Sequence, residues 1–144
     1  MYAIVENQKV VSSGTLTELF PSISFPATGP DQEFCKENNL TAVEMTAKYN
    51  KDTEELVFLD TPKVTKGGKV VGVEVKKLSD EDAWTRIKTK RDQLLTSTDW
   101  TQLPDTLDAA KTKAYAEYRA ALRDITSAKS PADVAWPKDP NEGK

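Results

Sequence analysis

The chain has 144 residues and a mass of 16.0 kDa, with 20 basic and 23 acidic side chains and a formal net charge of −3, which allows one domain or two very small ones. Its charges are spread along the sequence, and the densest basic run, Arg86 to Arg91, lies on a predicted helix that also carries acids. This distribution argues against a nucleic-acid binder. The chain has no histidine, which argues against a histidine base or metal ligand, and its single Cys35 excludes an intramolecular disulfide. It also has no long apolar stretch, which argues against a signal peptide and a membrane span.

The first forty residues predict a hairpin followed by short helical pieces. Two apolar segments, Tyr2–Val5 and Lys9–Ser12, flank a turn-prone Glu-Asn-Gln and indicate paired strands. The segment Thr15–Phe20 is typical of a single helical turn capped by its threonine. Two prolines and a glycine make Ser22–Pro30 an extended loop, and Asp31–Asn38 is predicted to form a short helix capped by its aspartate.

The next part of the chain predicts a β meander. Within its last strand Val71, Val73 and Val75 alternate with other residues, which is the period of a sheet with one buried and one wet face. The glycine pair in Lys66–Gly68 favours a tight hairpin. Together with the N-terminal hairpin this predicts an antiparallel sheet of about five short strands. The strands predicted here are Leu40–Tyr49, Glu55–Asp60, Lys63–Val64 and Lys69–Lys77.

The pattern changes to helical spacing at Ser79, which has the features of a helix cap followed by three acids. A first helix is predicted to run to about Ser97, and a second is predicted to begin at Pro104–Thr106 and to end near Ile125. Their short connection favours an antiparallel helical hairpin, and an extended tail follows from Thr126. The predicted fold class is therefore α+β.

These patterns divide the chain into three regions. We predict a β-rich region over residues 1–78, a helical-hairpin module over residues 79–137 and a flexible tail over residues 138–144. Whether the first two regions share one core is left open, because periodicity does not decide it.

No segment has the pattern of a catalytic, metal or phosphate site. Lys66–Lys69 lacks the spacing of a phosphate-binding loop, and the acids Asp80–Asp82 lack the loop spacing of a calcium site and fit a helix start instead. A polysaccharide hydrolase would need two carboxylates placed across a cleft, and the sequence gives no such pair. We therefore expect no enzyme activity, no metal and no cofactor.

The connection between the two predicted helices is unusual in composition. Residues Ser97–Asp105 include a tryptophan, two aspartates and a proline, where glycine, serine and asparagine would be sufficient for a hairpin turn. One interpretation is structural, with Trp100 covering the end of the helical pair and Asp99 or Asp105 capping a helix. The alternative is that these side chains contact a partner.

The C-terminal part resembles the phage tail assembly chaperone-like family. The resemblance lies, in the same order, in Arg91–Leu95, Thr98–Asp105, Tyr115–Ile125 and Val134–Pro137. Thr98 stands where the family usually has serine, and the Gly-Phe often found before the closing Trp-Pro is absent. The resemblance implies a non-enzymatic phage tail or tail-fibre assembly protein in the host cytoplasm. The alternative is a permanent tail, fibre or baseplate-associated subunit of the virion.

An assembly factor acts by binding, so its site residues are expected to be aromatic and arginine side chains on the helical module. We expect the partner to be a phage tail or tail-fibre protein, with a homo-oligomer also possible and neither nucleic acid nor membrane involved. Arg119 and Arg123 share a predicted helix face near Glu117 and Asp124, so they could instead form surface ion pairs. The predicted partner-binding residues are Trp84, Trp100, Thr101, Gln102, Pro104, Asp105, Tyr115, Tyr118, Arg119, Arg123 and Trp136.

Overall fold

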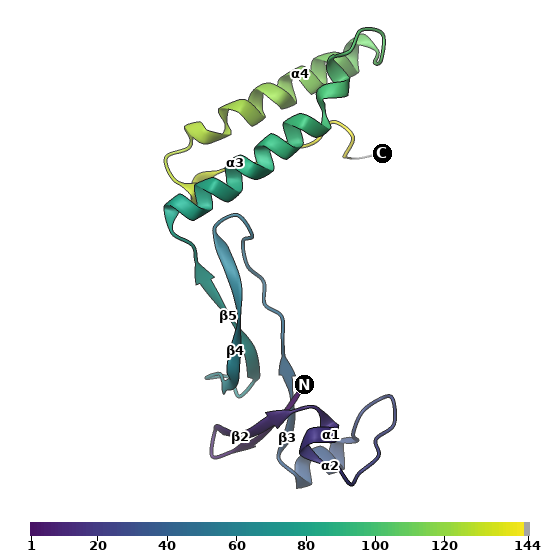
Figure 1. Cartoon of the computed structure of the whole chain (residues 1–144), viewed down its shortest axis with the longest axis vertical. Helices are drawn as coiled ribbons and strands as arrows, with labels where there is room; N and C mark the ends of the chain where they lie inside the picture. Colours follow the sequence, from purple (N-terminus) through teal and green to yellow (C-terminus); the bar gives the residue numbers. More distant parts are fainter. Residues whose placement is uncertain (143–144) are drawn as a thin grey trace. The chain divides into compact units, whose positions relative to one another are not determined.

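The computed structural model describes residues 1–142 and divides the chain into two compact units. The first unit comprises Met1–Tyr49 and Glu55–Lys76, and the second comprises Asn50–Glu54 and the chain from Lys77 onward. The chain is a mixed α+β protein, as the sequence predicted (Figure 1). No helix among the described residues is long and apolar enough to cross a membrane.

The first unit is built around a five-stranded sheet in the order β2-β1-β3-β5-β4. Strand β1 pairs antiparallel with both β2 and β3, whereas β3 pairs parallel with β5 through Val43–Val70 and Glu44–Val71. The prediction of an antiparallel meander is therefore wrong at this pair, because β3 does not turn back onto β4. The strands are β1 (Tyr2–Glu6), β2 (Lys9–Gly14), β3 (Leu40–Glu44), β4 (Glu54–Val64) and β5 (Val70–Lys77).

The predicted bounds of β3 and β4 differ from the structure. Strand β3 ends at Glu44 rather than Tyr49, and Thr46, Ala47 and Lys48 are exposed. The predicted strands Glu55–Asp60 and Lys63–Val64 are one continuous strand, β4. Pro62 lies between the two predicted segments, but β4 is at an edge of the sheet, where a residue without an N–H does not interrupt the ladder.

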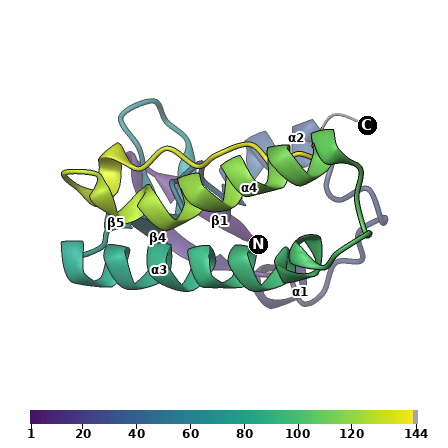
Figure 2. The same cartoon turned by 90° about the horizontal axis from the view of Figure 1, so that it is seen from above.

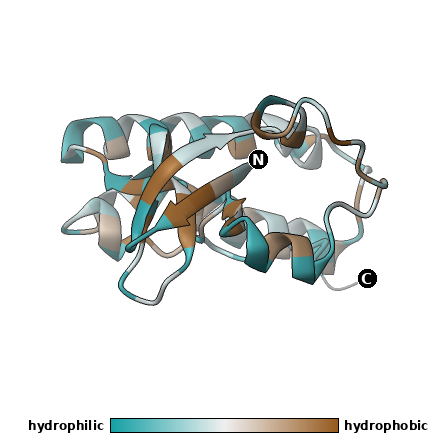
Figure 3. Cartoon of the chain, turned by 90° about the horizontal axis from the view of Figure 1, so that it is seen from below, coloured by the Kyte–Doolittle hydropathy of each residue, from teal (hydrophilic) through white to brown (hydrophobic). Residues whose placement is uncertain are grey.

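The core of the first unit is small and aliphatic. It consists of Ala3, Val43 and Val70, with Val5 and Met45 among the half-buried side chains packed around it. Hydrophobic colour follows much of the strand that starts at the N-terminus (Figure 3).

Both short helices of this unit begin at the predicted residues. Thr15 caps α1 (Leu16–Leu19) in a capping box with Glu18, and Asp31 caps α2 (Gln32–Glu37). Asn39 ends the second of these segments with a φ of 50°, the left-handed conformation that asparagine tolerates.

The second unit contains two long helices that lie side by side and are joined at one end (Figures 1 and 2). Ser79 caps α3 (Asp80–Ser97), as predicted. Helix α4 (Ala109–Asp124) begins later than predicted, because Asp108 rather than Asp105 caps it. The intervening chain forms a 3-10 turn, η1 (Asp99–Gln102).

The chain after α4 is not fully extended. It contains the 3-10 turns η2 (Ile125–Ser127) and η3 (Pro131–Asp133), which the sequence prediction missed. Trp136 then packs on the core formed by Tyr115, Tyr118 and Leu122. The predicted flexible segment 138–144 lies partly outside the described residues.

A prediction for the first unit concerns Gly72 in β5, which is buried. A Cβ added there would lie 3.0 Å from Val43 Cγ1 and closer still to Met45 Sδ. Overpacking of this kind should make Gly72→Ala less stable than wild type by about 1–3 kcal/mol in urea unfolding. The matched control is Gly67→Ala, whose nearest neighbour would be 3.9 Å away. Equal stability of the two variants would contradict the prediction.

Candidate partner-binding site at the end of the helical pair

A buried arginine joins α4 to the end of α3. The Arg119 Nη1 group donates hydrogen bonds to the Leu95 carbonyl oxygen at 2.6 Å and to Thr98 Oγ1 at 2.8 Å. Its Nη2 group forms an ion pair with Asp99 Oδ1 at 2.8 Å. Arg119 is only 7% exposed, and its Nε has no hydrogen-bond partner among residues 1–142. We call these four residues the arginine clamp.

The threonine and glutamine side chains of the connection hold its turn together. Thr98 Oγ1 donates to the Leu94 carbonyl oxygen at 2.8 Å, which continues α3 into η1. Thr101 is 2% exposed and donates to the Thr98 carbonyl oxygen at 2.6 Å, and Gln102 Nε2 donates to Thr101 Oγ1 at 3.0 Å. These polar side chains are therefore used inside the turn.

The apolar side chains of the same turn remain exposed. Trp100 is 45% exposed and Leu103 is 60% exposed, and the Leu103 N–H donates to the Trp100 carbonyl oxygen at 3.2 Å. The Trp100 ring makes an edge-on contact with the buried Tyr115, with 5.9 Å between centroids. Pro104 and Asp105 are exposed beside them. We call Trp100, Leu103, Pro104 and Asp105 the tip surface.

Asp105 has a backbone conformation that is rare for a residue with a side chain. Its φ is 63°, in the left-handed region that aspartate and asparagine tolerate better than most residues. The Thr106 hydroxyl donates to the Leu103 carbonyl oxygen at 2.7 Å and so supports the same turn. Internal hydrogen bonds therefore explain most of the polar residues in this unusual connection. They do not explain why Trp100 and Leu103 are exposed.

A second polar cluster of this unit holds the C-terminal segment. The Trp136 Nε1 group donates to Asp52 Oδ2 at 2.5 Å, and the Lys90 ammonium lies 4.1 Å from the centre of the Trp136 ring. Lys90 also forms an ion pair with Asp52 at 3.4 Å. Trp136 is therefore half-buried and bound on two sides within its own unit.

The structure separates the predicted partner-binding residues into exposed and internal groups. Of the eleven, Trp100, Gln102, Pro104, Asp105 and Arg123 are exposed, although the Gln102 amide is used inside the turn. Trp84 and Trp136 are half-buried, and Thr101, Tyr115, Tyr118 and Arg119 are buried.

The sequence allowed surface ion pairs of Arg119 and Arg123 with Glu117 and Asp124, but the ion pair of Arg119 is a different one. Arg119 pairs with Asp99 across the connection, whereas Glu117 pairs with Lys113 along α4 at 3.9 Å. Sequence reasoning also passed over Leu103 as a site residue. The sequence did contain a signal for it: Leu103 is an apolar residue in a mostly polar connection, directly before the turn-prone pair Pro104-Asp105.

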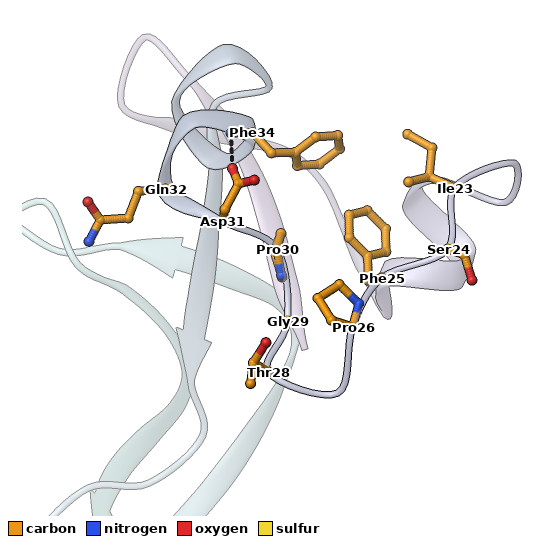
Figure 4. A pocket seen from close by; sticks show the side chains of 10 residues that line it. All are labelled: Ile23, Ser24, Phe25, Pro26, Thr28, Gly29, Pro30, Asp31, Gln32 and Phe34. Atoms are coloured by element: carbon orange, nitrogen blue, oxygen red, sulfur yellow. Dashed lines mark hydrogen bonds between the residues drawn. The ribbon is translucent and has the colours of Figure 1, made fainter.

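The first unit has its own hollow, of about 590 Å³. Figure 4 shows Ile23, Phe25 and Phe34 gathered on it, with Asp31 accepting the hydrogen bond of the Phe34 N–H. Phe25 and Phe34 meet edge to face with centroids 5.1 Å apart. Ile23, in the loop Ser22–Pro30, is 42% exposed at this hollow. No group of three potential metal ligands occurs within residues 1–142.

Burial affects the titration of two tyrosines in the second unit. It raises the pKa of Tyr115 and of Tyr118 above the usual value, and the carboxylate of Asp139 raises both pKa values further. Both rings belong to the core and touch each other edge to face, with centroids 6.5 Å apart. The neutral phenols are therefore part of the folded state.

The clamp predicts a clear order of stability among three variants. Arg119→Met should lower the free energy of unfolding by about 2–3 kcal/mol, because it leaves hydrogen-bond acceptors of the connection unsatisfied. Asp99→Asn should have an effect under about 1 kcal/mol, because that carboxylate is 63% exposed and solvent screens its ion pair. The exposed Arg123→Met is the control, and urea unfolding is the measurement. An Arg119→Met variant as stable as Arg123→Met would disprove the clamp.

The raised tyrosine pKa values predict alkaline destabilisation. Above the unfolded pKa of about 10 the unfolded tyrosines lose protons while the folded ones keep them, so the stability contributed by the neutral phenols is lost as the pH rises through the folded pKa. The variant with Tyr115→Phe and Tyr118→Phe should lose less stability than wild type between neutral and alkaline pH, measured by urea unfolding at each pH. Equal losses in both proteins would contradict the prediction.

Comparison with known proteins identifies the C-terminal part. Residues 84–141 match the family model described as phage tail assembly chaperone protein, and this stretch contains every predicted partner-binding residue. Neither the curated proteins nor the solved structures contain a significant match to the chain. The match supports a role in phage tail assembly. Residues 84–141, the C-terminal part of the chain, thus match the phage tail assembly chaperone family, as their resemblance implied.

Proposed function

We propose that this chain assists the assembly of a phage tail or tail fibre by binding a tail protein through the tip surface, without catalysis. The observation that carries the proposal is the exposure of Trp100 and Leu103 on a connection whose polar groups are hydrogen-bonded internally. Tryptophan is among the residues that most often dominate protein–protein binding energy, and the neighbouring leucine adds apolar area to the contact.

Rigidity makes this surface suited to binding. The arginine clamp and the Thr101 hydrogen bond fix the backbone on either side of Trp100, so little conformational entropy remains to be lost when a partner binds. The contact with Tyr115 orients the indole while leaving almost half of it exposed. Tyr115 in turn contacts the buried ring of Tyr118 edge to face.

The family match supports an action during tail assembly, and we propose that this action takes place in the host cytoplasm during infection. The module of residues 79–137 is proposed to carry the binding function. A permanent place in the tail is the competing role, and mass spectrometry of salt-washed virions separates the two. Absence from virions, with recovery of the chain bound to a tail protein from infected cells, is the expected result, and stoichiometric presence in virions would refute a transient chaperone.

The tip surface predicts a loss of binding when its apolar groups are removed. Leu103→Ser, in the full tagged chain co-expressed with the tail proteins of the same phage genome, should weaken binding to the captured tail protein by at least about tenfold, equivalent to 1.4 kcal/mol. Its matched control is Val11→Ser, since Val11 is 61% exposed but lies in the first unit. Circular dichroism checks that both variants fold. Unchanged binding by Leu103→Ser would exclude the tip as the contact.

A further inference from the structure

The chain segment that carries the tip surface has acidic side chains and no basic ones. From Thr98 to Ala110 the chain has three aspartates, Asp99, Asp105 and Asp108, and neither lysine nor arginine. The first cation beyond it is Lys111, in the first turn of α4. The clamp arginine beneath the connection is buried, so its charge is not offered to a partner.

Internal contacts use only part of this negative charge. Asp99 accepts from Arg119 through Oδ1, yet 63% of its side chain is exposed. Asp108 accepts from the Lys111 N–H through Oδ1 at 2.8 Å as the cap of α4. Asp105 makes no side-chain hydrogen bond or ion pair among residues 1–142. An apolar surface with exposed carboxylates at its border is therefore available.

We propose that the partner segment bound at the tip is basic and apolar: a stretch of a tail protein that places lysine or arginine beside a leucine-sized or aromatic side chain. This inference rests on the proposed function and adds the chemistry of the partner. The apolar contact with Trp100 and Leu103 supplies affinity, and the carboxylates select cationic segments and reject acidic ones. A second copy of the chain is a competing occupant, which sedimentation of the free protein would reveal as a dimer that Leu103→Ser dissolves. That result would overturn the proposal.

Two substitutions neutralise the tip while keeping its backbone. Asparagine tolerates the left-handed conformation of residue 105 and caps helices as well as aspartate does at residue 108, so the variant with Asp105→Asn and Asp108→Asn should fold like wild type. The matched control carries Asp31→Asn and Asp60→Asn in the first unit. It changes the net charge by the same amount and likewise contains one helix cap and one exposed aspartate.

The probes are two synthetic peptides that share the same leucines and differ in their charged residues, lysine in one and glutamate in the other. Each is titrated into the full isotope-labelled chain at low salt and followed by amide chemical shifts. The lysine peptide should shift Trp100, Leu103 and residue 105, and the glutamate peptide should not. The tip variant should bind the lysine peptide about three- to tenfold more weakly than the control variant, and added salt should remove the difference.

The outcomes separate this inference from the proposed function. Equal binding of both peptides, binding of neither, or equal affinity of the tip and control variants would overturn the basic-segment proposal. If Leu103→Ser still abolishes capture of the tail protein in those cases, the binding function at the tip stands with a neutral partner. If Leu103→Ser leaves that capture unchanged, the proposed function fails by itself.

Discussion

The second unit depends on the guanidinium of Arg119. Removing this group from water has a large unfavourable free energy, which hydrogen bonds to Leu95, Thr98 and Asp99 offset. Because these acceptors lie on the last turn of α3 and on the connection, one side chain fixes two elements against α4. The unpartnered Nε shows that the arrangement is not fully satisfied by protein atoms. The position of the tip surface follows from this clamp.

The second unit also reaches beyond the stretch that matches the family. Asp52 precedes α3 by a whole strand pair, yet it accepts the Trp136 N–H and pairs with Lys90. The segment Asn50–Glu54 therefore belongs to the same compact unit as the helices. The closing Trp-Pro of the family pattern thus has a structural role here: its tryptophan attaches the C-terminal segment to residues that no local pattern connects with it.

Local signals in the sequence predicted the local structure well. Thr15, Asp31 and Ser79 each precede a helix by one residue, and the side-chain oxygen of each accepts a backbone N–H in the manner that defines a cap. The same reasoning misplaced the start of α4, because Asp105 and Asp108 are both plausible caps. Leu107 packs against the core just before α4 begins, and we attribute the choice of Asp108 rather than Asp105 as the cap to this tertiary contact.

Features that depend on contacts between distant parts of the chain could not be predicted from local sequence patterns. The parallel pairing of β3 with β5 depends on which edge of β3 remains available after β1 has paired with it, and alternation of Val71 and Val73 does not encode that choice. The burial of the Arg119 side chain could not be predicted from the sequence either. An arginine in an amphipathic helix is usually exposed, and only the unpaired carbonyl groups at the end of α3 explain why this one is buried.

The exposure of Trp100 and Leu103 differs from that of other apolar residues on the chain. Val11 and Phe58 are also exposed, at 61% and 64%, but single apolar residues on a strand are common on protein surfaces. At the tip, two large side chains are exposed on one hydrogen-bonded turn, with carboxylates around them and a buried arginine below. Thr101 shows that this turn can bury a side chain completely. The connection therefore buries the polar Thr98 and Thr101 while it exposes the apolar Trp100 and Leu103, an arrangement that fits the binding surface proposed above.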